Sequence, residues 1–124
     1  MRLLFQSVVC LSSLLLVLSV SERLLPAAEI DFNRDVRPIL SDLCFQCHGP
    51  DSSQRKADLR LDLQAGLLGT DAESTVVVKG KAAESELFSR LISKDPDLQM
   101  PPASSGKQIT ATQIETIKQW INDG

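Results

Sequence analysis

Three residues that could do chemistry stand close together near the middle of the chain: Cys44, Cys47 and His48. Two thiols separated by two residues, with an imidazole directly after the second, form the attachment signature of a c-type haem. The thiols can bond to the two vinyl groups on adjacent pyrrole rings as thioethers, and the histidine then lies under the iron as its proximal ligand. The spacing therefore predicts one covalently bound haem c, anchored by Cys44 and Cys47, with His48 as a metal ligand.

A second iron ligand can come from Met100, because the only other methionine, Met1, begins the chain. Met100 lies well downstream of His48, in a loop that Pro101 and Pro102 stiffen. A lone methionine more often fills a gap in the core, and this is the ordinary alternative. We predict distal ligation instead, because Met100 lies in this loop directly before two prolines and a haem would need a second axial ligand. A Met thioether favours reduced iron and raises the reduction potential, as suits an electron carrier.

The Cys-x-x-Cys pair allows three other interpretations. A thioredoxin-like dithiol belongs to a β-α-β unit, whereas Cys44 and Cys47 end a predicted helix with no parallel-sheet pattern around them. Zinc ordinarily takes four ligands, and beyond residue 21 the chain offers two cysteines and one histidine. A disulfide across two residues closes too small a loop to stabilise much. Single-electron transfer without catalysis is the leading prediction, and a dithiol–disulfide redox protein is the alternative.

The first residues have the character of an export signal. Arg2 precedes an apolar run over residues 3–20, and the small residues at its end suit cleavage after Ser21. We predict a signal peptide over residues 1–21, with residue 28 as the latest cleavage point. An uncleaved anchor is disfavoured because polar residues interrupt the run. The predicted location is periplasmic or otherwise exported, which is where bacteria attach haem to such motifs.

The rest of the chain is predicted to hold a short linker, residues 22–29, and one c-type cytochrome domain, residues 30–124. The chain has 13 basic and 16 acidic residues and a net charge of −3; loss of the signal removes only Arg2, which leaves −4. A mildly acidic domain gives no reason to expect nucleic acid or an anionic membrane surface as partner. We expect redox proteins as partners, and no membrane association once the signal is removed.

Hydrophobic spacing predicts an all-α domain with irregular loops and at most a minor strand pair. The first helix is expected to follow an N-cap at Asn33 and to run for about ten residues into the Cys44–His48 motif, where Gly49 and Pro50 stop it. Alternating apolar and polar residues from Leu59 to Leu63 indicate a short extended segment.

Two more helices are expected in the second half of the chain. An amphipathic helix is predicted over residues 82–93, and a loop over residues 94–106 follows it. The last helix begins with a capping box from Thr110 to Gln113 and closes at Gly124. Four Phe, one Trp and no Tyr make the core poor in aromatic side chains, so that a large apolar cofactor would complete it.

A series of short runs follows in order along the chain: Ile30–Leu40, Cys44–Pro50, Leu59–Asp62, Gly80–Lys81 before Glu84–Ser85, Met100–Pro102, and the closing helix with Trp120 and Ile121. Together, over about residues 30–124, they resemble the planctomycete-type cytochrome c domain. The resemblance implies a small, class I-like cytochrome c fold, with the first and last helices packed together around one covalent haem. It also implies that the haem is held by Cys44, Cys47, His48 and Met100.

Two further residues are interpreted from their positions. Arg60 could pair with a haem propionate, or it could stand as a solvated charge on an extended segment. Trp120 is expected to pack between the terminal helices, near the haem.

Overall fold

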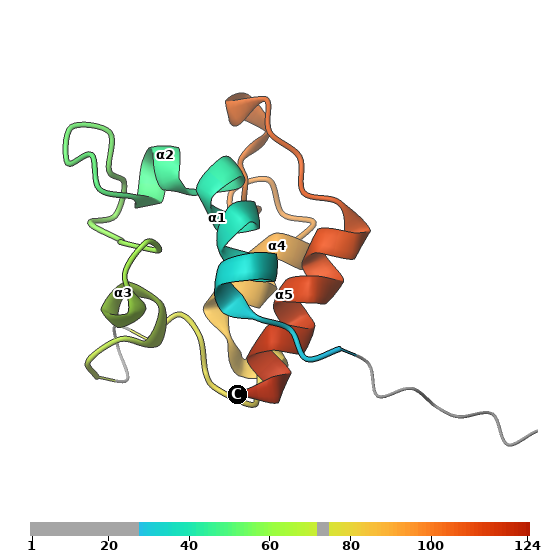
Figure 1. Cartoon of the computed structure of the whole chain (residues 1–124). Coiled ribbons are helices and arrows are strands. Elements are labelled where there is room, and N and C mark those ends of the chain that lie inside the picture. The colour runs from blue at the N-terminus through green and yellow to red at the C-terminus, as the bar shows by residue number, and fades with distance from the viewer. Residues whose placement is uncertain (1–27, 72–74) are drawn as a thin grey trace, which may run out of the picture.

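The computed structural model describes residues 28–71 and 75–124, and every regular element in these ranges is helical (Figure 1). The predicted all-α class is therefore confirmed for the described part of the chain. The predicted signal peptide, residues 1–21, lies outside the described residues, as does most of the predicted linker.

The minor strand pair that the sequence allowed is not formed among the described residues, and the expected extended segment from Leu59 to Leu63 is interrupted by a turn at residues 61 and 62. The long-range backbone bond of this segment runs from the Leu61 N–H to the His48 carbonyl, 2.8 Å away. Leu61 is 3% exposed and Leu63 is 46% exposed. Alternation puts successive side chains on opposite sides of any extended piece of chain, whether or not a second strand lies beside it. Residues two positions apart would then share a side, yet only Leu61 of the three leucines is buried, so the alternation indicated neither the exposure of Leu63 nor the irregular backbone of this segment.

The first helical segment begins at Asp31 and not at the predicted cap, Asn33. The Asp31 side chain accepts a hydrogen bond of 2.8 Å from the backbone N–H three residues on. A wide π-type turn, η1 (Phe32–Val36), then leads into α1 (Arg37–Leu43). The change of helix type stands directly before Pro38, which has no N–H to donate to a helical carbonyl.

A short helix, α2 (Phe45–His48), continues from α1 after a break at Cys44. The backbone N–H groups of its last two residues both bond to the Cys44 carbonyl, at 3.1 and 2.8 Å. The helix stops at Gly49, as predicted. A Cβ atom at this position would lie 2.2 Å from the carbonyl oxygen of Phe45, so that a residue with a side chain does not fit this ending.

The chain then turns back into a further short helix, α3 (Gln64–Leu68). Gly66 lets this helix lie directly against the preceding segment, because a Cβ atom there would lie 1.7 Å from the carbonyl oxygen of Arg60. Residues 60–66 are thereby closed into a tight, compact turn.

The next predicted helix is divided into a 3-10 turn, η2 (Ala82–Glu84), and α4 (Glu86–Ile92). The division falls at Ser85, which is 1% exposed. Its hydroxyl accepts a hydrogen bond from the Val78 N–H and donates one to the Lys81 carbonyl, both at 2.9 Å. Such bonds between side chain and backbone compete with the helical ladder, which accounts for the break.

The last helix, α5 (Ala111–Asp123), begins with the predicted capping box. The Thr110 hydroxyl accepts a bond of 3.2 Å from the Gln113 N–H, and the Gln113 side chain accepts one of 2.9 Å from the Thr110 N–H. The helix closes at Gly124, also as predicted. One short 3-10 turn, η3 (Ala103–Ser105), lies in the loop before it.

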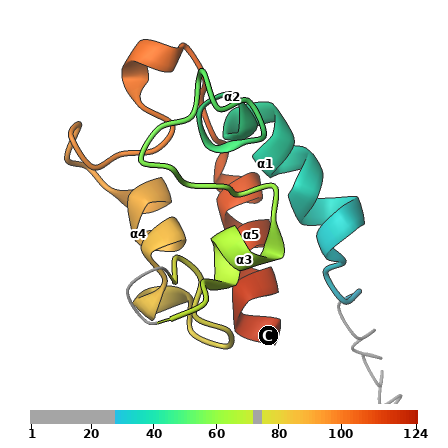
Figure 2. The same ribbon diagram turned by 90° about the vertical axis from the view of Figure 1, so that its left-hand side faces the viewer.

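The two ends of the domain pack together, as expected. Helix α5 contacts η1, η2 and α4, and Figure 2 shows α5 between α1 and α4. The rings of Phe32 and Trp120 join the first and last helical segments, with their centroids 5.2 Å apart and their planes tilted by 42°.

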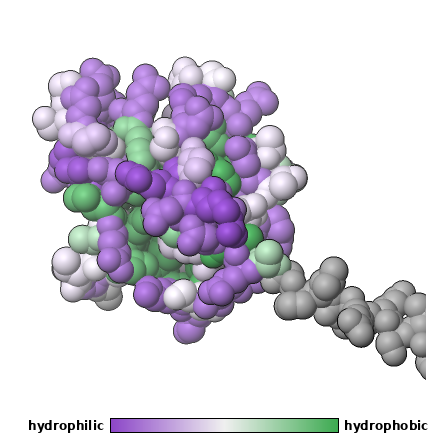
Figure 3. All heavy atoms as spheres, viewed as in Figure 1, coloured by the Kyte–Doolittle hydropathy of each residue, from purple (hydrophilic) through white to green (hydrophobic). Residues whose placement is uncertain are grey.

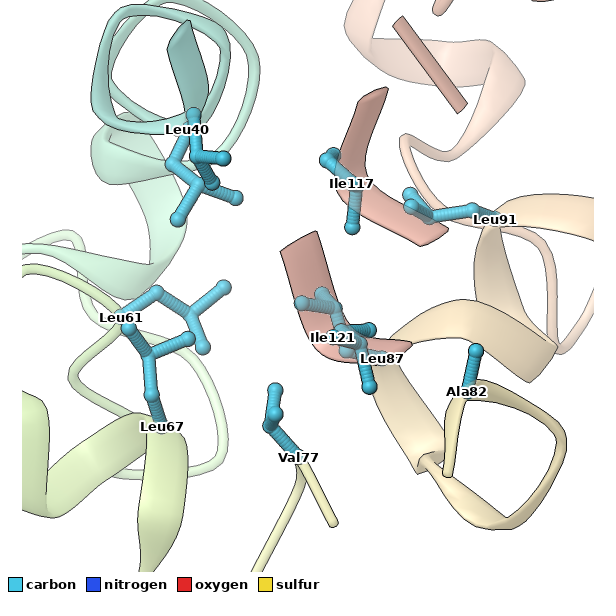
Figure 4. Close-up of a cluster of buried hydrophobic side chains, with 10 residues drawn as sticks. Leu40, Leu61, Leu67, Val77, Ala82, Leu87, Leu91, Ile117 and Ile121 are labelled. Atoms are coloured by element: carbon cyan, nitrogen blue, oxygen red, sulfur yellow. The ribbon is translucent and has the colours of Figure 1, made fainter. Parts of the chain in front are cut away.

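A cluster of buried apolar side chains fills the space between these helices and the segment that carries α3 (Figure 4). Its members are Val36, Leu40, Leu61, Leu67, Val77, Ala82, Leu87, Leu91, Ile117 and Ile121. Figure 3 shows further hydrophobic side chains in a hollow of one face, with hydrophilic side chains around them. The apolar interior is therefore not fully covered on that face.

Candidate functional site

A cavity of about 670 Å³ lies beside the Cys-x-x-Cys-His turn. It is lined by residues of α2, of the segment 57–66 and of α4. Small-molecule and cofactor sites occupy about 300–1,000 Å³ and are mostly apolar. The cavity has both properties, and the charged residues that line it are Asp58, Arg60, Glu86 and Arg90.

Three of the four predicted site residues line this cavity: Cys44, His48 and Met100. Cys47 is not among the lining residues, although it stands next to His48 in α2. Both motif thiols are free and partly buried. The structure therefore brings one thiol, the imidazole and the thioether to a common space, with the second thiol in the adjoining turn.

The environment of Cys44 disfavours a reactive thiolate. Burial raises the pKa of its thiol to about 11. The Lys107 ammonium group works against this rise, and the neighbouring Cys47 adds to it. Lys107 is held nearby, because its Nζ atom donates to the backbone carbonyl of Asp42 at the end of α1. Nucleophilic cysteines of dithiol enzymes have a lowered pKa, so the Cys44 environment is of the opposite kind.

His48 presents an imidazole that is suited to metal binding. Its Nδ1 atom is buried and has no hydrogen-bond partner among the described residues. Burial lowers the pKa of His48, the charge of Arg90 lowers it further, and the Lys56 backbone carbonyl offsets part of the effect. A neutral imidazole is the form that ligates a metal. Buried polar atoms are rarely left without partners, so this one is consistent with a site for a ligand.

The loop after the motif folds back onto it. The Lys56 N–H donates to the Cys47 carbonyl at 2.7 Å, and the Arg55 side chain donates to the carbonyls of Gly49 and Pro50. At its tip, two consecutive residues that line the cavity, Ala57 and Asp58, have left-handed backbone conformations with φ of +55° and +50°. Such conformations are uncommon for residues other than glycine.

Met100 reaches the cavity from the loop that follows α4. Its backbone N–H donates to the Arg90 carbonyl at 3.0 Å, and its side chain is partly buried. This carbonyl belongs to the last turn of α4, where helical carbonyls have no partner within the helix. The loop is thus attached to α4 at the predicted ligand itself.

Arg60 lines the cavity, but its guanidinium group is paired with Asp62. The Nε atom donates to Asp62 Oδ1 at 2.8 Å, and a second bond joins Nη2 to Oδ2. The hydrogen bonds from Arg60 lower the pKa of the Asp62 carboxyl. Arg60 is therefore paired within the chain and partly exposed, and pairing with a propionate remains a prediction.

Sequence reasoning missed a second charged pair at the cavity, Glu86 and Arg90. The Arg90 Nε atom donates to Glu86 Oε1 at 2.7 Å. The two residues are four positions apart in α4, and each stands next to a leucine of the apolar stripe, Leu87 and Leu91. Opposite charges four positions apart on a helix can form an ion pair, so this spacing could have predicted the pair from the sequence.

Trp120 packs between the terminal helices as predicted, but it does not line the cavity beside the motif. It lines a separate cavity of about 390 Å³, together with Phe32, Leu67 and Lys79.

No group of three or more His, Cys, Asp and Glu side chains in residues 28–71 and 75–124 could hold a metal ion. In the same ranges, no helix is both long enough and apolar enough to cross a membrane.

Comparison with known proteins gives one match. The profile of the family described as Planctomycete cytochrome C matches residues 44–104. The matched range begins at the first cysteine of the motif and contains Cys47, His48 and Met100. No curated protein and no solved structure matches the chain.

Proposed function

The chain belongs to the planctomycete cytochrome c family, and we propose that it carries single electrons through one covalent haem c with His48 and Met100 as its axial ligands. Cytochromes c are haem proteins that carry electrons, so we propose a carrier rather than an enzyme. The observation that carries the proposal is that Cys44, His48 and Met100 line one cavity of about 670 Å³.

The two motif cysteines would hold the haem. Each thiol would add across a vinyl double bond, so that a carbon–sulfur and a carbon–hydrogen bond would form and no oxidant would be needed. Cys44 faces the cavity, and Cys47 lies in the adjoining turn, three positions along the chain. Because both thiols are free, neither must first be released from a disulfide.

His48 would supply the proximal nitrogen. Burial lowers the pKa of its partly buried imidazole, which favours the neutral ring, the form that can donate an electron pair. Backbone hydrogen bonds on both sides of His48 hold this residue in place, which supports its role as a ligand. The His48 N–H is bonded to Cys44 on one side, and the His48 carbonyl accepts the Leu61 N–H on the other.

Met100 would supply the distal sulfur. A thioether is a soft, weakly basic ligand that stabilises Fe(II) relative to Fe(III) and raises the reduction potential. When bound, the haem supplies a one-electron couple at its iron. The apolar lining from Leu59, Leu61, Val76 and Leu87 would keep water from this couple.

The surroundings of Cys44 argue against the dithiol–disulfide alternative. Catalytic cysteines of this class lie in partly exposed, electropositive surroundings that lower the thiol pKa. Burial instead raises the pKa of Cys44 to about 11, in spite of Lys107. A thiol with this pKa is almost entirely protonated at neutral pH and is a poor attacking group.

We also propose export to the periplasm and exchange of electrons with other redox proteins. Domains of the cytochrome c kind are typically exported, and the apolar run over residues 3–20 suits an export signal. The mild negative charge of the chain favours partners other than nucleic acid or anionic lipid.

The test is to produce the full chain in a bacterium that attaches haem to exported proteins, and then to denature it and extract it with acid and organic solvent. The haem should stay with the polypeptide, and the mass should exceed that of the chain without its predicted signal peptide by one haem. Replacing both Cys44 and Cys47 by Ser should abolish retention. Cys10→Ser, the same change in the predicted signal, is the matched control and should leave retention unchanged. Haem that extracts freely from the wild type would overturn the proposal.

A further inference from the structure

Arg90 is the residue of α4 to which the Met100 loop is attached. Its backbone carbonyl accepts the Met100 N–H at 3.0 Å. This carbonyl is in the last turn of the helix, so the loop supplies a partner that the helix cannot. This hydrogen bond therefore closes the chain between Arg90 and Met100 into a loop, and Met100 lies at the end of that loop.

The Arg90 side chain makes a second attachment to the same loop. Its Nη1 atom lies 3.5 Å from the Leu98 carbonyl oxygen, and its Nε atom donates to Glu86 Oε1 at 2.7 Å. The donors of a guanidinium group are fixed in one plane, so that the bond to Glu86 also sets the direction in which Nη1 points. Arg90 also lines the cavity with Met100.

The rest of the loop is bonded mainly to itself. The N–H groups of Leu98 and Gln99 donate to the Asp95 carbonyl at 3.1 and 2.8 Å, and the Asp97 N–H donates to the Asp95 carboxylate at 2.9 Å. These bonds shape a turn, but they do not fasten it to the body of the domain. Residues 94–99 are all exposed, so buried apolar contact contributes little to holding this part of the loop.

We propose that Arg90 is a positioning residue that keeps the Met100 loop closed over the cavity and thereby holds the Met100 sulfur within reach of the iron. The inference rests on the proposed function, because it requires Met100 to be the distal ligand. Loss of the guanidinium group should leave the haem attached and the domain folded, and should increase the fraction of molecules in which Met100 has left the iron.

The test is a titration of the oxidised, haem-loaded protein with imidazole, a foreign ligand that binds only when Met100 is displaced. The apparent dissociation constant equals the intrinsic constant divided by the open fraction. Arg90→Gln should bind imidazole about two- to fivefold more tightly than the wild type, as expected for the loss of a long, exposed hydrogen bond at the lower end of the usual energy range. Arg90→Lys keeps the charge but lacks the planar fork, and should fall between the two.

Glu86→Gln removes the carboxylate that orients the guanidinium group, and should produce a smaller increase in imidazole affinity. Lys118→Gln is the matched control. It removes an exposed ion pair with Glu115 in α5, and neither Lys118 nor Glu115 lines the cavity. This variant should therefore bind imidazole as the wild type does. Retention of covalent haem and a helical circular dichroism spectrum show that each variant is folded. If Arg90→Gln fails to fold, the imidazole affinities of Arg90→Lys and Glu86→Gln are compared with that of the wild type instead.

The near-infrared band of sulfur-to-iron charge transfer separates the two ways in which the inference can fail. If the wild type shows this band and Arg90→Gln binds imidazole with unchanged affinity, Arg90 does not position the loop, while the proposed function stands. If the wild type lacks the band, Met100 is not a ligand, and this part of the proposed function and the inference fall together.

Discussion

The backbone N–H of Leu61 donates a hydrogen bond of 2.8 Å to the carbonyl of His48. Leu61 is a core residue, 3% exposed, and it lines the same cavity as His48. The segment after the motif is therefore fixed to the imidazole-bearing residue at a place where the cavity meets the core. The position of the proposed iron ligand depends on the packing of the domain as well as on its own short turn.

Truncation of Leu61 should weaken this connection. We expect Leu61→Ala to lower the free energy of unfolding by about 2–5 kcal/mol, because a buried leucine loses its contacts and leaves a void. Urea denaturation of the haem-loaded protein gives the value. Leu98→Ala is the control, since Leu98 is 46% exposed and such a change ordinarily costs less than about 0.5 kcal/mol. Equal effects of the two changes would contradict the assignment of Leu61 to the core.

The left-handed conformation of Ala57 should be relieved by glycine. A residue with a Cβ atom at φ +55° carries a cost of about 1–2 kcal/mol that glycine avoids, while glycine also loses more entropy on folding. We expect Ala57→Gly to raise the free energy of unfolding by up to about 1 kcal/mol. Ala65→Gly, inside helix α3, should lower it by about 0.5–1 kcal/mol. The same sign for both variants would show that backbone strain does not act at Ala57.

Local signals predicted the helix ends well, with one instructive exception. The Thr110–Gln113 box and the stop at Gly49 depend on residues a few positions apart, and both were predicted correctly. At the first helix, two good capping residues lie two positions apart. The structure selects Asp31, whose N–H is in turn accepted by the Asp35 carboxylate at 2.8 Å. Propensity alone ranks Asp and Asn equally as caps, so it could not decide.

The composition of the cavity could be predicted only in part. The motif identified Cys44 and His48 because haem attachment imposes a fixed spacing on adjacent residues. Glu86 and Arg90 enter the cavity because α4 lies opposite the motif, and that contact joins segments about 40 residues apart. Long-range packing of this kind leaves no fixed spacing in the sequence.

Removal of the buried hydroxyl of Ser85 should cost stability. In Ser85→Ala the Val78 N–H loses its acceptor, and an unsatisfied buried donor costs about 1–3 kcal/mol. Thermal or urea unfolding should register a loss of this size. Ser89→Ala is the matched control, because the Ser89 hydroxyl is exposed and bonds only within its own helical turn. If the two variants lose the same amount, Ser85 does not hold residues 78–82 in place.

Asp62 should give the domain a pH-dependent increment of stability. Hydrogen bonds from Arg60 lower its pKa below the ordinary value of 3.8. A carboxyl with a depressed pKa stabilises the folded state above its unfolded pKa, and this contribution is lost as the pH falls through the folded value. The stability difference between the wild type and Asp62→Asn should therefore be constant above pH 3.8 and should shrink below it. Urea titrations at a series of pH values measure this difference, and one that grows on acidification would contradict the pairing.

Replacement of Met100 tests the distal ligand directly. In Met100→Ala the sixth coordination position should open to water or a foreign ligand, because Met100 is the only described methionine and it lines the cavity with His48. Axial ligands set haem reduction potentials over a range of roughly 0.8 V. The reduction potential of Met100→Ala should fall by part of this range, because a ligand that favours Fe(II) is lost. Potentiometry measures this shift, and the oxidised variant should also lose the near-infrared sulfur-to-iron band.

Leu98→Ala, in the same loop, is the matched control and should retain both the band and the potential, because its side chain is exposed and it does not line the cavity. A wild type without the band, combined with an unchanged potential in Met100→Ala, would mean that Met100 only packs against the cavity. The iron would then be five-coordinate or bound by a lysine. An open or exchangeable sixth position would favour ligand binding at the iron, and the protein would no longer be a simple electron carrier.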